Sequence, residues 1–412
     1  MRLKSEPKKI LLITSGQPSI NPRLVKEADA LCAAGYDVTV LYNYWNDWAT
    51  EQDIKLLATK NWKAIRVGGH PLQKKLVYFI SRLIHKLSKL IIQKTGYFEY
   101  FANFAIVRGS YFLIKSAGKI KADLYIAHNL GALPASYLAA KKNAKPCGFD
   151  AEDFHRQELS DDVNSFHFKI TSFLEDKYIP GLNYVIASSP LIAEQYASLY
   201  CRDVVSILNV FPKSHNISLN KNENQPLKLF WFSQTIGPKR GLEQVIDAMG
   251  ISSVLSELHL LGKINPDYYN QLMLLCKTNK IDFNRIKFYS PINPDDINEF
   301  ASKFDIGMAA EVDVCFNRKI SLTNKLFTYL QSGLAIAASS TIAQSTFINS
   351  NTGIGRVYSN SNELAEVLNY YDANRDVLFE TKKRSMQLGQ NALNWEIESQ
   401  KILRLVENTL AG

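Results

Sequence analysis

Hydrophobic runs of strand length alternate with amphipathic stretches of helix length along most of this chain. The run at 8–16 predicts a buried strand, and residues 24–35 repeat apolar positions at helical spacing before a second strand at 36–43. Parallel strands need a helical crossover, so this order predicts the first unit of a doubly wound α/β fold. Further strands that end in polar residues are predicted at 122–129, 145–153 and 183–190.

A polar segment at 212–226, which reads as a linker, separates this series from a second one. The second series begins with a strand at 228–237 and a helix at 241–250, and its further strands are predicted at 256–262, 285–291, 305–311 and 334–339. At 412 residues the chain is too long for one hydrophobic core. We therefore predict two Rossmann-like domains, 1–211 and 212–393, and an amphipathic terminal helix within 394–412.

The segment 317–339 predicts a loop, a helix and a buried strand in succession. Thr323 or Asn324 can cap this helix, because their side-chain oxygens accept from N–H groups of the first turn. Gly333 can end it in the left-handed conformation. A helix N-terminus beside strand ends is an anion site, and Lys325 in the first turn suits a ligand phosphate.

Composition narrows the class of protein. Hydrophobic residues make up 46% of the chain and charged residues 21%, as in globular proteins with sizeable cores. The basic start lacks the apolar length of a signal peptide, and no run of about 18–20 apolar residues is present, so we expect no spanning helix. Five scattered cysteines without a C-x-x-C pair favour reduced, buried thiols in the cytoplasm and disfavour a cysteine zinc site.

The net charge of +9 is unevenly distributed. Residues 1–120 hold 19 Lys and Arg against 8 Asp and Glu, a net +11, which leaves −2 for the rest of the chain. The helix predicted at 74–94 separates an apolar face from a cationic one; the apolar face holds Leu76, Ile80, Leu83, Ile84, Leu87 and Ile91, and the cationic face Lys75, Arg82, Lys86 and Lys89. This layout is typical of a helix on an anionic membrane surface, and also of a helix packed on its own domain. No recognition motif accompanies the charge, so nucleic acid is disfavoured as a partner.

Six stretches, taken in their order and spacing, resemble a known family. They are 10–41, 123–142, 184–196, 207–212, 232–249 and NKLFTYLQSGLAIAAS at 324–339. The chain resembles the large group of retaining-type, nucleotide-sugar-dependent glycosyltransferases with the GT-B architecture (group 1, family 4-like). The resemblance implies two Rossmann-like domains facing each other across a cleft, with the donor bound by the C-terminal domain and the acceptor met by the N-terminal one. It also implies that a terminal helix crosses back to the first domain.

The chain departs from the family's pair of glutamates in an E-x7-E pattern. Ile320 stands at the earlier position and Thr328 at the later one. The groups that hold the ribose and the sugar hydroxyls are therefore left open. Glu311, at the end of a predicted strand, is a candidate replacement, and a solvated loop acid is the alternative.

The phosphate loop departs as well. The family's early Arg is replaced by Gln234 and Thr235, and only the later cation is kept, as Arg240. Fixed cations and helix dipoles stabilise a departing nucleoside diphosphate, and Arg240 and Lys325 are the candidate cations, with ordinary surface charge as the alternative. The donor-binding residues that the resemblance implies are Gly16, Thr235, Arg240, Gly262, Asn324, Lys325 and Thr328. No D-x-D triplet is present, so we expect transfer without a metal, and no cofactor beyond the nucleotide-sugar co-substrate.

Catalytic candidates follow strands of the N-terminal domain. His128 comes between a buried strand and a glycine loop, so we expect it to point into the cleft and bind the sugar or a phosphate, with a structural histidine as the alternative. Asp153 and His155, in the polar run 149–158, can position or deprotonate an acceptor hydroxyl. A helix-capping run explains these acids equally well. With Glu311, these three residues form the predicted catalytic set.

Together these observations predict a retaining, metal-independent glycosyltransferase of envelope or capsule polysaccharide assembly. Its expected partners are a nucleotide-sugar donor, a glycan or lipid-linked acceptor, and an anionic membrane surface met through 74–94. The expected location is the cytoplasm, at the inner face of the cell membrane. Two alternatives stay open: a nucleotide-sugar epimerase of the same architecture, and a non-catalytic subunit that binds sugar nucleotides or lipid.

Overall fold

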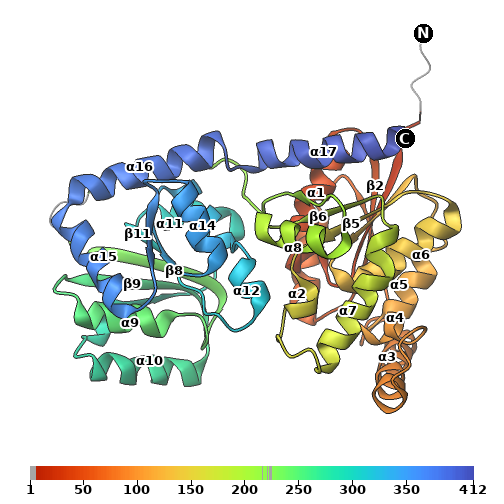
Figure 1. Ribbon diagram of the computed structural model, residues 1–412, viewed down its shortest axis with the longest axis horizontal. Coiled ribbons are helices and arrows are strands. Elements are labelled where there is room, and N and C mark those ends of the chain that lie inside the picture. The colour runs from red at the N-terminus through yellow and green to blue at the C-terminus, as the bar shows by residue number, and fades with distance from the viewer. Residues whose placement is uncertain (1–5, 216, 220, 222–224) are drawn as a thin grey trace, which may run out of the picture. The chain divides into compact units, whose positions relative to one another are not determined.

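A computed structural model describes residues 6–215, 217–219, 221 and 225–412 of the chain. The described residues divide into two compact units (Figure 1). Unit 1 runs to Ile207 and includes Ser399–Gly412, and unit 2 is Leu208–Glu398. The predicted linker contains residues 216, 220 and 222–224, and the predicted lack of a signal peptide rests partly on residues 1–5; these lie outside the described residues.

Unit 1 is built on a seven-stranded sheet in the order β3-β2-β1-β4-β5-β6-β7, with parallel neighbours. Its strands are β1 (Lys9–Thr14), β2 (Asp37–Asn43), β3 (Lys63–Val67), β4 (Leu124–His128), β5 (Cys147–Ala151), β6 (Tyr184–Ala187) and β7 (Val205–Ser206). The strand order reverses between β1 and β4, where Thr14 is paired in register with His128. Open α/β sheets bind ligands at the carboxyl ends of strands beside such a reversal.

Helices flank this sheet (Figure 1), namely α1 (Pro22–Ala33), α2 (Asp47–Leu57), α3 (Lys75–Thr95), α4 (Ala102–Ala105), α5 (Ser110–Ala117), α6 (Leu133–Asn143), α7 (Phe166–Tyr178) and α8 (Pro190–Tyr200). The first of them shows why they form. Asn21 caps α1, because its Oδ1 accepts from the Leu24 N–H at 3.0 Å. Leu24, Ala28 and Leu31 recur at helical spacing and are buried, so they form the face that packs on the sheet.

Unit 2 repeats this design with a six-stranded sheet in the order β10-β9-β8-β11-β12-β13, again with parallel neighbours. Its strands are β8 (Leu227–Ile236), β9 (Ser256–Ile264), β10 (Ile286–Tyr289), β11 (Ile306–Ala309), β12 (Ala335–Ser339) and β13 (Gly355–Tyr358). Trp231, Leu260, Met308 and Ala337 are fully buried and lie in one hydrophobic core. The order reverses between β8 and β11, so the ends of these strands are the expected ligand site of this unit.

The helices of unit 2 are α9 (Leu242–Ile251), α10 (Pro266–Thr278), α11 (Ile297–Ala301), α12 (Phe316–Ile320), α13 (Asn324–Ser332), α14 (Ile342–Ser350), α15 (Ser361–Ala373) and α16 (Arg375–Asn391), and α17 (Trp395–Ala411) begins in this unit. Gly333 ends α13 with φ +66°, as predicted. The predicted side-chain cap of α13 is wrong. Thr323 occupies the N-cap position without a capping hydrogen bond, and the Asn324 Oδ1 accepts instead from the Asn209 Nδ2 at 2.9 Å.

The predicted α/β class and both doubly wound sheets are confirmed. The prediction that the cysteines are all buried is wrong. Cys201 is exposed and Cys32 is half-buried, because each lies at the C-terminal end of a helix near solvent. Among the described residues, no helix combines the length and the hydropathy needed to cross a bilayer.

Candidate functional site

A buried carboxylate and two cations meet beyond the end of β11 in unit 2. The Glu311 side chain is 2% exposed, and its Oε1 lies 2.7 Å from Lys325 Nζ. Its Oε2 lies 2.8 Å from Arg318 Nη1. Lys325 Nζ is also 5.4 Å from the centroid of the Trp231 ring. The middle of β8, the end of β11, α12 and the start of α13 therefore contribute to one site.

Arg240 belongs to the same site. It precedes Gly241, where an added Cβ would lie 3.0 Å from the Ala310 Cβ, so this loop packs against the chain just before Glu311. Burial by itself raises the pKa of Glu311, but Lys325, Arg318 and Arg240 outweigh burial and hold that pKa below its ordinary value. We call Arg240, Glu311, Arg318 and Lys325 the cationic cluster, because three cations face one carboxylate.

The N-terminus of α13 adds to this positive character. The first N–H groups of a helix have no intrahelical partner and carry the positive end of its dipole. Thr323 lies at the N-cap, and its Oγ1 is buried with no hydrogen-bond partner among the described residues. This end of the helix can therefore bind an anion beside the cationic cluster.

Two other predicted donor-binding residues of unit 2 lie on strands. Thr235 is exposed near the end of β8. Gly262 lies in β9 with φ +150°, and a Cβ there would be 2.2 Å from the Ser233 carbonyl oxygen. Only glycine fits this approach of two strands, so the packing of the sheet explains Gly262 without any ligand.

Two more predicted donor-binding residues lie apart from the cationic cluster. Thr328 belongs to α13 but is only 1% exposed, so its hydroxyl is enclosed by unit 2. Gly16 follows β1 in unit 1, where its N–H donates to the Thr14 Oγ1 at 3.4 Å. The structure therefore joins Arg240, Lys325, Glu311 and the start of α13, and leaves Thr328 and Gly16 outside that group.

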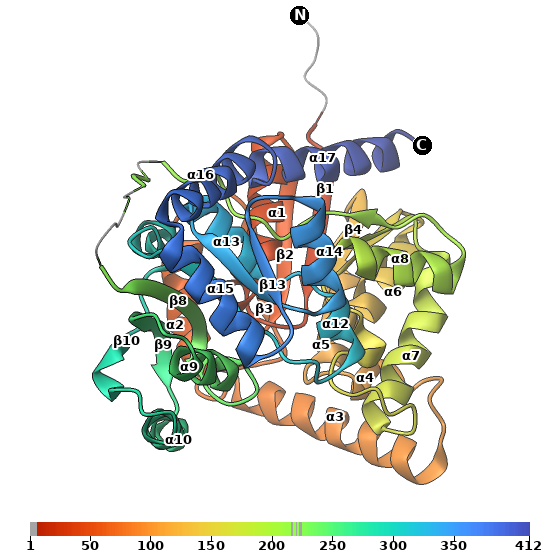
Figure 2. The ribbon, with the colours of Figure 1, turned by 60° about the vertical axis from the view of Figure 1, so that its left-hand side comes forward.

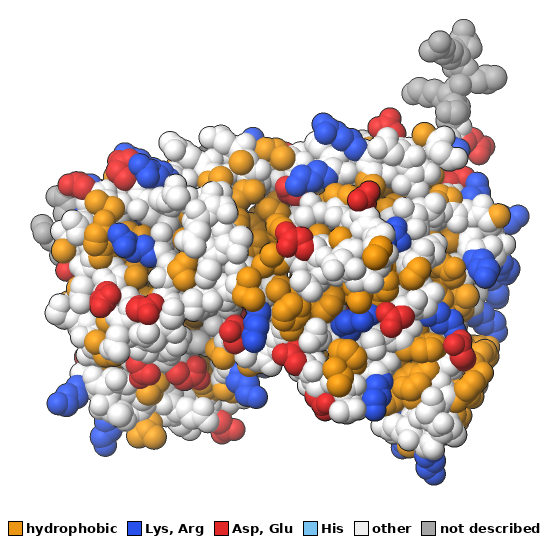
Figure 3. All heavy atoms as spheres, in the orientation of Figure 1, with side chains coloured by type: hydrophobic (Ala, Val, Ile, Leu, Met, Phe, Trp, Pro, Cys, Tyr) orange, Lys and Arg blue, Asp and Glu red, His pale blue; other side chains and the backbone are white. Residues whose placement is uncertain are grey.

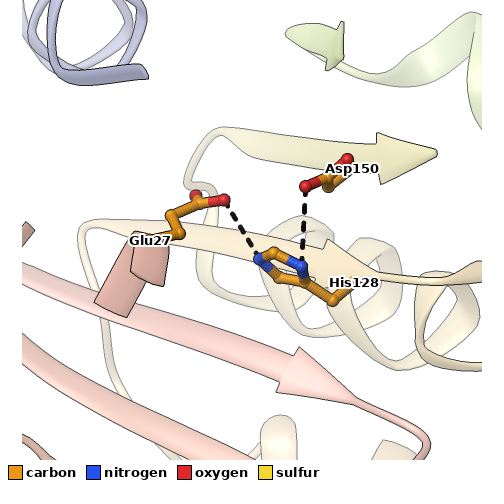
Figure 4. A group of neighbouring side chains, drawn as sticks. All are labelled: Glu27, His128 and Asp150. Carbon is orange, nitrogen blue, oxygen red and sulfur yellow. Dashed lines mark ion pairs between the residues drawn. The ribbon is translucent and has the colours of Figure 1, made fainter. Parts of the chain in front are cut away.

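In unit 1, His128 ends β4 and has no exposed surface. Its Nε2 lies 3.1 Å from the Glu27 Oε2, and its Nδ1 lies 3.6 Å from the Asp150 Oδ2 (Figure 4). The Glu152 Oε1 is 3.4 Å from the same Nδ1. The ring is therefore enclosed by three carboxylates, as in the structural alternative considered for this residue.

The charges of this group identify it as a set of ion pairs. Burial alone lowers the pKa of His128, but Glu27, Glu152 and Asp150 raise it to about 10. Glu27, His128 and Asp150 also place ligand atoms within 4.8 Å of one another, a spacing that suits a metal ion. However, Arg23 Nε lies 2.5 Å from Asp150 Oδ2, and a protonated imidazole has no lone pair for a metal. Two cationic side chains thus occupy the place that a metal would take.

His155 is buried in a short 3₁₀ segment, η3 (His155–Gln157). Its Nδ1 lies 2.8 Å from the Glu158 Oε2, and its Nε2 is buried with no hydrogen-bond partner among the described residues. Burial alone lowers the pKa of His155, but nearby carboxylates, Glu158 first, raise it to about 9. The unpartnered Nε2 is the part of this ring that can serve a ligand.

Asp153 is half-buried between β5 and η3. Its carbonyl oxygen accepts from the Tyr196 hydroxyl at 3.2 Å, and its carboxylate helps to raise the pKa of His155. The helix-capping alternative for this run of acids is wrong, because the next α-helix begins at Phe166 and is capped by Ser165.

Sequence reasoning missed the partners of these residues. Arg23 and Glu27 are four residues apart on α1 and are both buried, as an i, i+4 charged pair on an otherwise apolar helix face can indicate. Asn21 was missed too, and its Nδ2 donates to the Glu152 Oε1 at 2.6 Å. Arg318, which pairs with Glu311, carried no signal in the sequence beyond its positive charge.

Known proteins resemble this chain in structure and not in sequence. No protein-family model and no curated protein sequence matches it. Anabaena HepE in complex with UDP is similar over 97% of this chain and 100% of its own, at 15% identity and a TM-score of 0.69. A S. aureus TarM variant in complex with fondaparinux, α-GlcNAc-glycerol and UDP is similar over 98% and 100%, at 12% identity and a TM-score of 0.65.

A weaker match is a Listeria monocytogenes protein assigned as a UDP-N-acetylglucosamine 2-epimerase, with 12% identity, a TM-score of 0.54, and 97% of this chain and 96% of its own covered. The glycosyltransferases HepE and TarM and the Listeria protein thus share one architecture with this chain. At such identities the likeness concerns the fold. The chain therefore has the two-domain GT-B fold, with one doubly wound sheet in each unit.

Proposed function

We propose that this chain is a glycosyltransferase that moves a sugar from a nucleotide-sugar donor to a glycan or lipid-linked acceptor. The cationic cluster at the N-terminus of α13 carries this proposal, because its side chains and the first N–H groups of α13 suit a diphosphate. A departing nucleoside diphosphate gains charge in the transition state, and fixed cations stabilise it. HepE and TarM have the same fold and were solved with UDP, which supports uracil as the donor base.

Within the cluster we assign different roles. Arg240 and the first N–H groups of α13 bind the diphosphate, and Lys325 supports them. Because each carboxylate oxygen of Glu311 already faces a cation, Glu311 positions Lys325 and is not a substitute for the family's ribose-binding glutamate. These cations supply the charge that a divalent metal supplies elsewhere, so transfer proceeds without one. The retaining outcome rests on the family resemblance alone.

The acceptor is assigned to unit 1. His155, through its unpartnered Nε2, and Asp153 are the proposed groups near the acceptor hydroxyl. His128 is enclosed by charged side chains, so its proposed role is to hold the end of β4 in place. The net charge of +11 in residues 1–120 supports an acceptor at the inner face of the cell membrane, as in envelope or capsule polysaccharide assembly.

Nucleotide binding tests the donor site. UDP is expected to raise the melting temperature, because a ligand that binds only the folded state stabilises it. Arg240→Ala and Lys325→Ala should each weaken UDP binding by roughly 1.5–3 kcal/mol, the range for hydrogen bonds to charged groups. Lys287→Gln removes an exposed cation on β10 of the same unit and serves as the control. Unchanged UDP affinity in both alanine variants would remove the proposed site.

The epimerase stays an alternative function, because the Listeria protein has the same fold. Measuring turnover distinguishes it from the transferase. A transferase releases UDP from a UDP-sugar at a rate that depends on an acceptor pool. An epimerase converts the donor sugar without any acceptor. A non-catalytic subunit binds UDP and leaves the donor intact in both cases.

A further inference from the structure

The outer face of α3 presents a continuous apolar stripe to solvent. Six large side chains of this helix are between 39% and 74% exposed, namely Leu76, Phe79, Ile80, Leu83, Leu87 and Leu90. We call them the α3 stripe. The helix packs on unit 1 through its opposite side, where Ser81, Ser88 and Ile92 are buried. Figure 2 shows α3 as a long helix at the edge of unit 1 with α4 beside it.

This orientation corrects the face expected from the sequence. Ile84 and Ile91 are half-buried, whereas Phe79 and Leu90 are exposed, because Ser81, Ser88 and Ile92 set the rotation of the helix on its unit. The alternative of an ordinary helix that buries its apolar face on its own domain does not describe α3. Its small polar residues face inward and its large apolar residues face outward.

Cations border the stripe. Residues 54–98 contain ten Lys and Arg and no Asp or Glu. With about 3.6 residues per turn, Lys75 and Lys86 fall at the edge of the stripe beside Phe79, and Lys94 continues it at the C-terminal end. All three lysines are exposed. Figure 3 shows orange and blue side chains together at the lower right, where Figure 1 places α3.

Two of the cations expected to face a membrane are held by unit 1 itself. The Arg82 guanidinium donates to the Tyr78 hydroxyl and lies 4.9 Å from the centre of that ring. Lys89 Nζ lies 5.9 Å from the centre of the Phe166 ring. The exposed lysines therefore carry the attraction, because Arg82 is held by Tyr78 of its own helix and Lys89 lies over Phe166 of α7.

Exposed aromatic residues flank both ends of α3. Trp45 lines a small hollow with Tyr78 and Arg82 near the start of the helix, and it is 47% exposed. Tyr97 and Tyr100 follow the end of the helix and are more than half exposed. Tyr and Trp are enriched at the level of lipid headgroups, because their rings are apolar at one end and polar at the other.

We propose that the α3 stripe docks flat on an anionic lipid bilayer, with its leucines below the headgroups and Lys75, Lys86 and Lys94 on lipid phosphates. A row of exposed cations in a sequence segment without Asp or Glu matches an anionic surface, and a neutral protein partner would not require it. The purpose of this docking, to bring a lipid-linked acceptor within reach, rests on the proposed function. The binding itself is independent of that function.

Sedimentation of the full chain with vesicles tests the proposal. At low salt the protein should pellet with phosphatidylcholine–phosphatidylglycerol vesicles, stay in the supernatant with phosphatidylcholine alone, and be released by added salt. Leu83→Gln with Leu87→Gln should weaken binding about tenfold or more, because two leucines that the bilayer would bury are lost from the contact. Leu255→Gln with Leu274→Gln is the matched control, since both leucines are more than half exposed in unit 2.

The lysines have a matched control as well. Replacing Lys75, Lys86 and Lys94 by Gln should abolish the preference for anionic vesicles, whereas the same change at the exposed Lys263, Lys277 and Lys287 of unit 2 should not. The UDP-induced melting shift should be unchanged in all four variants, which shows that they are folded and separates this test from that of the donor site. Wild type that stays in the supernatant at low salt, or equal loss in variant and control, overturns the proposal. So does a wild-type dimer that the leucine variant converts to monomer without any vesicle binding.

Discussion

At the scale of single residues, His128 shows that a residue at a position typical of ligand binding can have a structural role instead. Its place at the end of β4, at the reversal of strand order, is where a ligand-binding histidine is expected. The side chain instead lies among Glu27, Asp150 and Glu152 with no exposed surface. The positive charge of His128 therefore stabilises the folded chain, and it is not available to bind a ligand.

That charge makes a prediction about pH. The folded pKa of His128, about 10, lies above the unfolded value near 6.5, so the stabilisation is complete below about pH 6.5 and is lost as the pH rises through 10. His128→Gln should cost roughly 3–5 kcal/mol near pH 7, because the buried Glu27 carboxylate loses the cation that it faces. The difference from wild type should shrink toward pH 10, as measured by denaturant unfolding at each pH.

The variant must be compared with wild type at each pH, because Lys26 changes the stability of both proteins in the opposite direction. Burial and Arg23 lower the pKa of Lys26 to about 7, so its contribution to stability rises as the pH increases above 7. His167→Gln is the control. Burial lowers the pKa of His167, so this residue is neutral above pH 7 and its variant should show no such trend. A His128→Gln difference that stays constant from pH 7 to 10 would contradict the buried imidazolium.

At the scale of elements, α13 connects a local signal in the sequence to the proposed donor site. Residues Lys325–Ser332 are all buried, so the helix is held on every side and its N-terminus is fixed beside Glu311. Gly333 lets the chain leave the helix in the left-handed conformation and enter β12 directly. The position of this glycine therefore sets where β12 begins.

Gly333→Ala should lower the free energy of unfolding of unit 2 by about 1–2 kcal/mol, the cost of a left-handed non-glycine residue. Contact with neighbours adds to this cost, because the new Cβ would lie 2.4 Å from the Leu219 Cδ2. Gly237→Ala is the control, since a Cβ there meets nothing within 4 Å. Thermal unfolding without nucleotide gives the comparison, and equal midpoints for the two variants would show that the left-handed turn is not required.

At the scale of the whole molecule, the chain carries two sheets of one design with different charge. Each has a reversal in strand order, and polar groups gather near both reversals. In unit 2 the group has an excess of cations around Glu311, whereas in unit 1 carboxylates outnumber the cations around His128. An anionic ligand such as a diphosphate therefore suits the group in unit 2 better, which is why the proposed donor site is assigned there.

The same charges predict independence from divalent metals. EDTA should leave UDP release from a UDP-sugar unchanged, and it should leave the melting temperature unchanged, because Arg23 and His128 already pair with Asp150 and Glu27 in the place that a metal would take in unit 1. UDP should be measured by chromatography, so that no metal-dependent coupling enzyme intervenes. Turnover that EDTA abolishes and Mg²⁺ or Mn²⁺ restores would overturn the assignment of the cationic cluster.

The sequence by itself determined the fold and the elements of this protein. Buried strands such as those at 8–16 and 334–339 have an uninterrupted apolar centre, helices such as 24–35 repeat apolar residues at helical spacing, and Gly333 marks a helix end. These signals are local, because each depends on residues only a few positions apart along the chain.

Only the tertiary structure decided which side chains meet and which faces stay open. The Glu311–Lys325 pair joins residues of different elements, and His128 is enclosed by Glu27 from α1 and Asp150 from β5. The rotation of α3 on its unit exposes Phe79 and Leu90 and half-buries Ile84. Periodicity gives the spacing of residues on a helix, but the packing of its neighbours chooses the face that is buried.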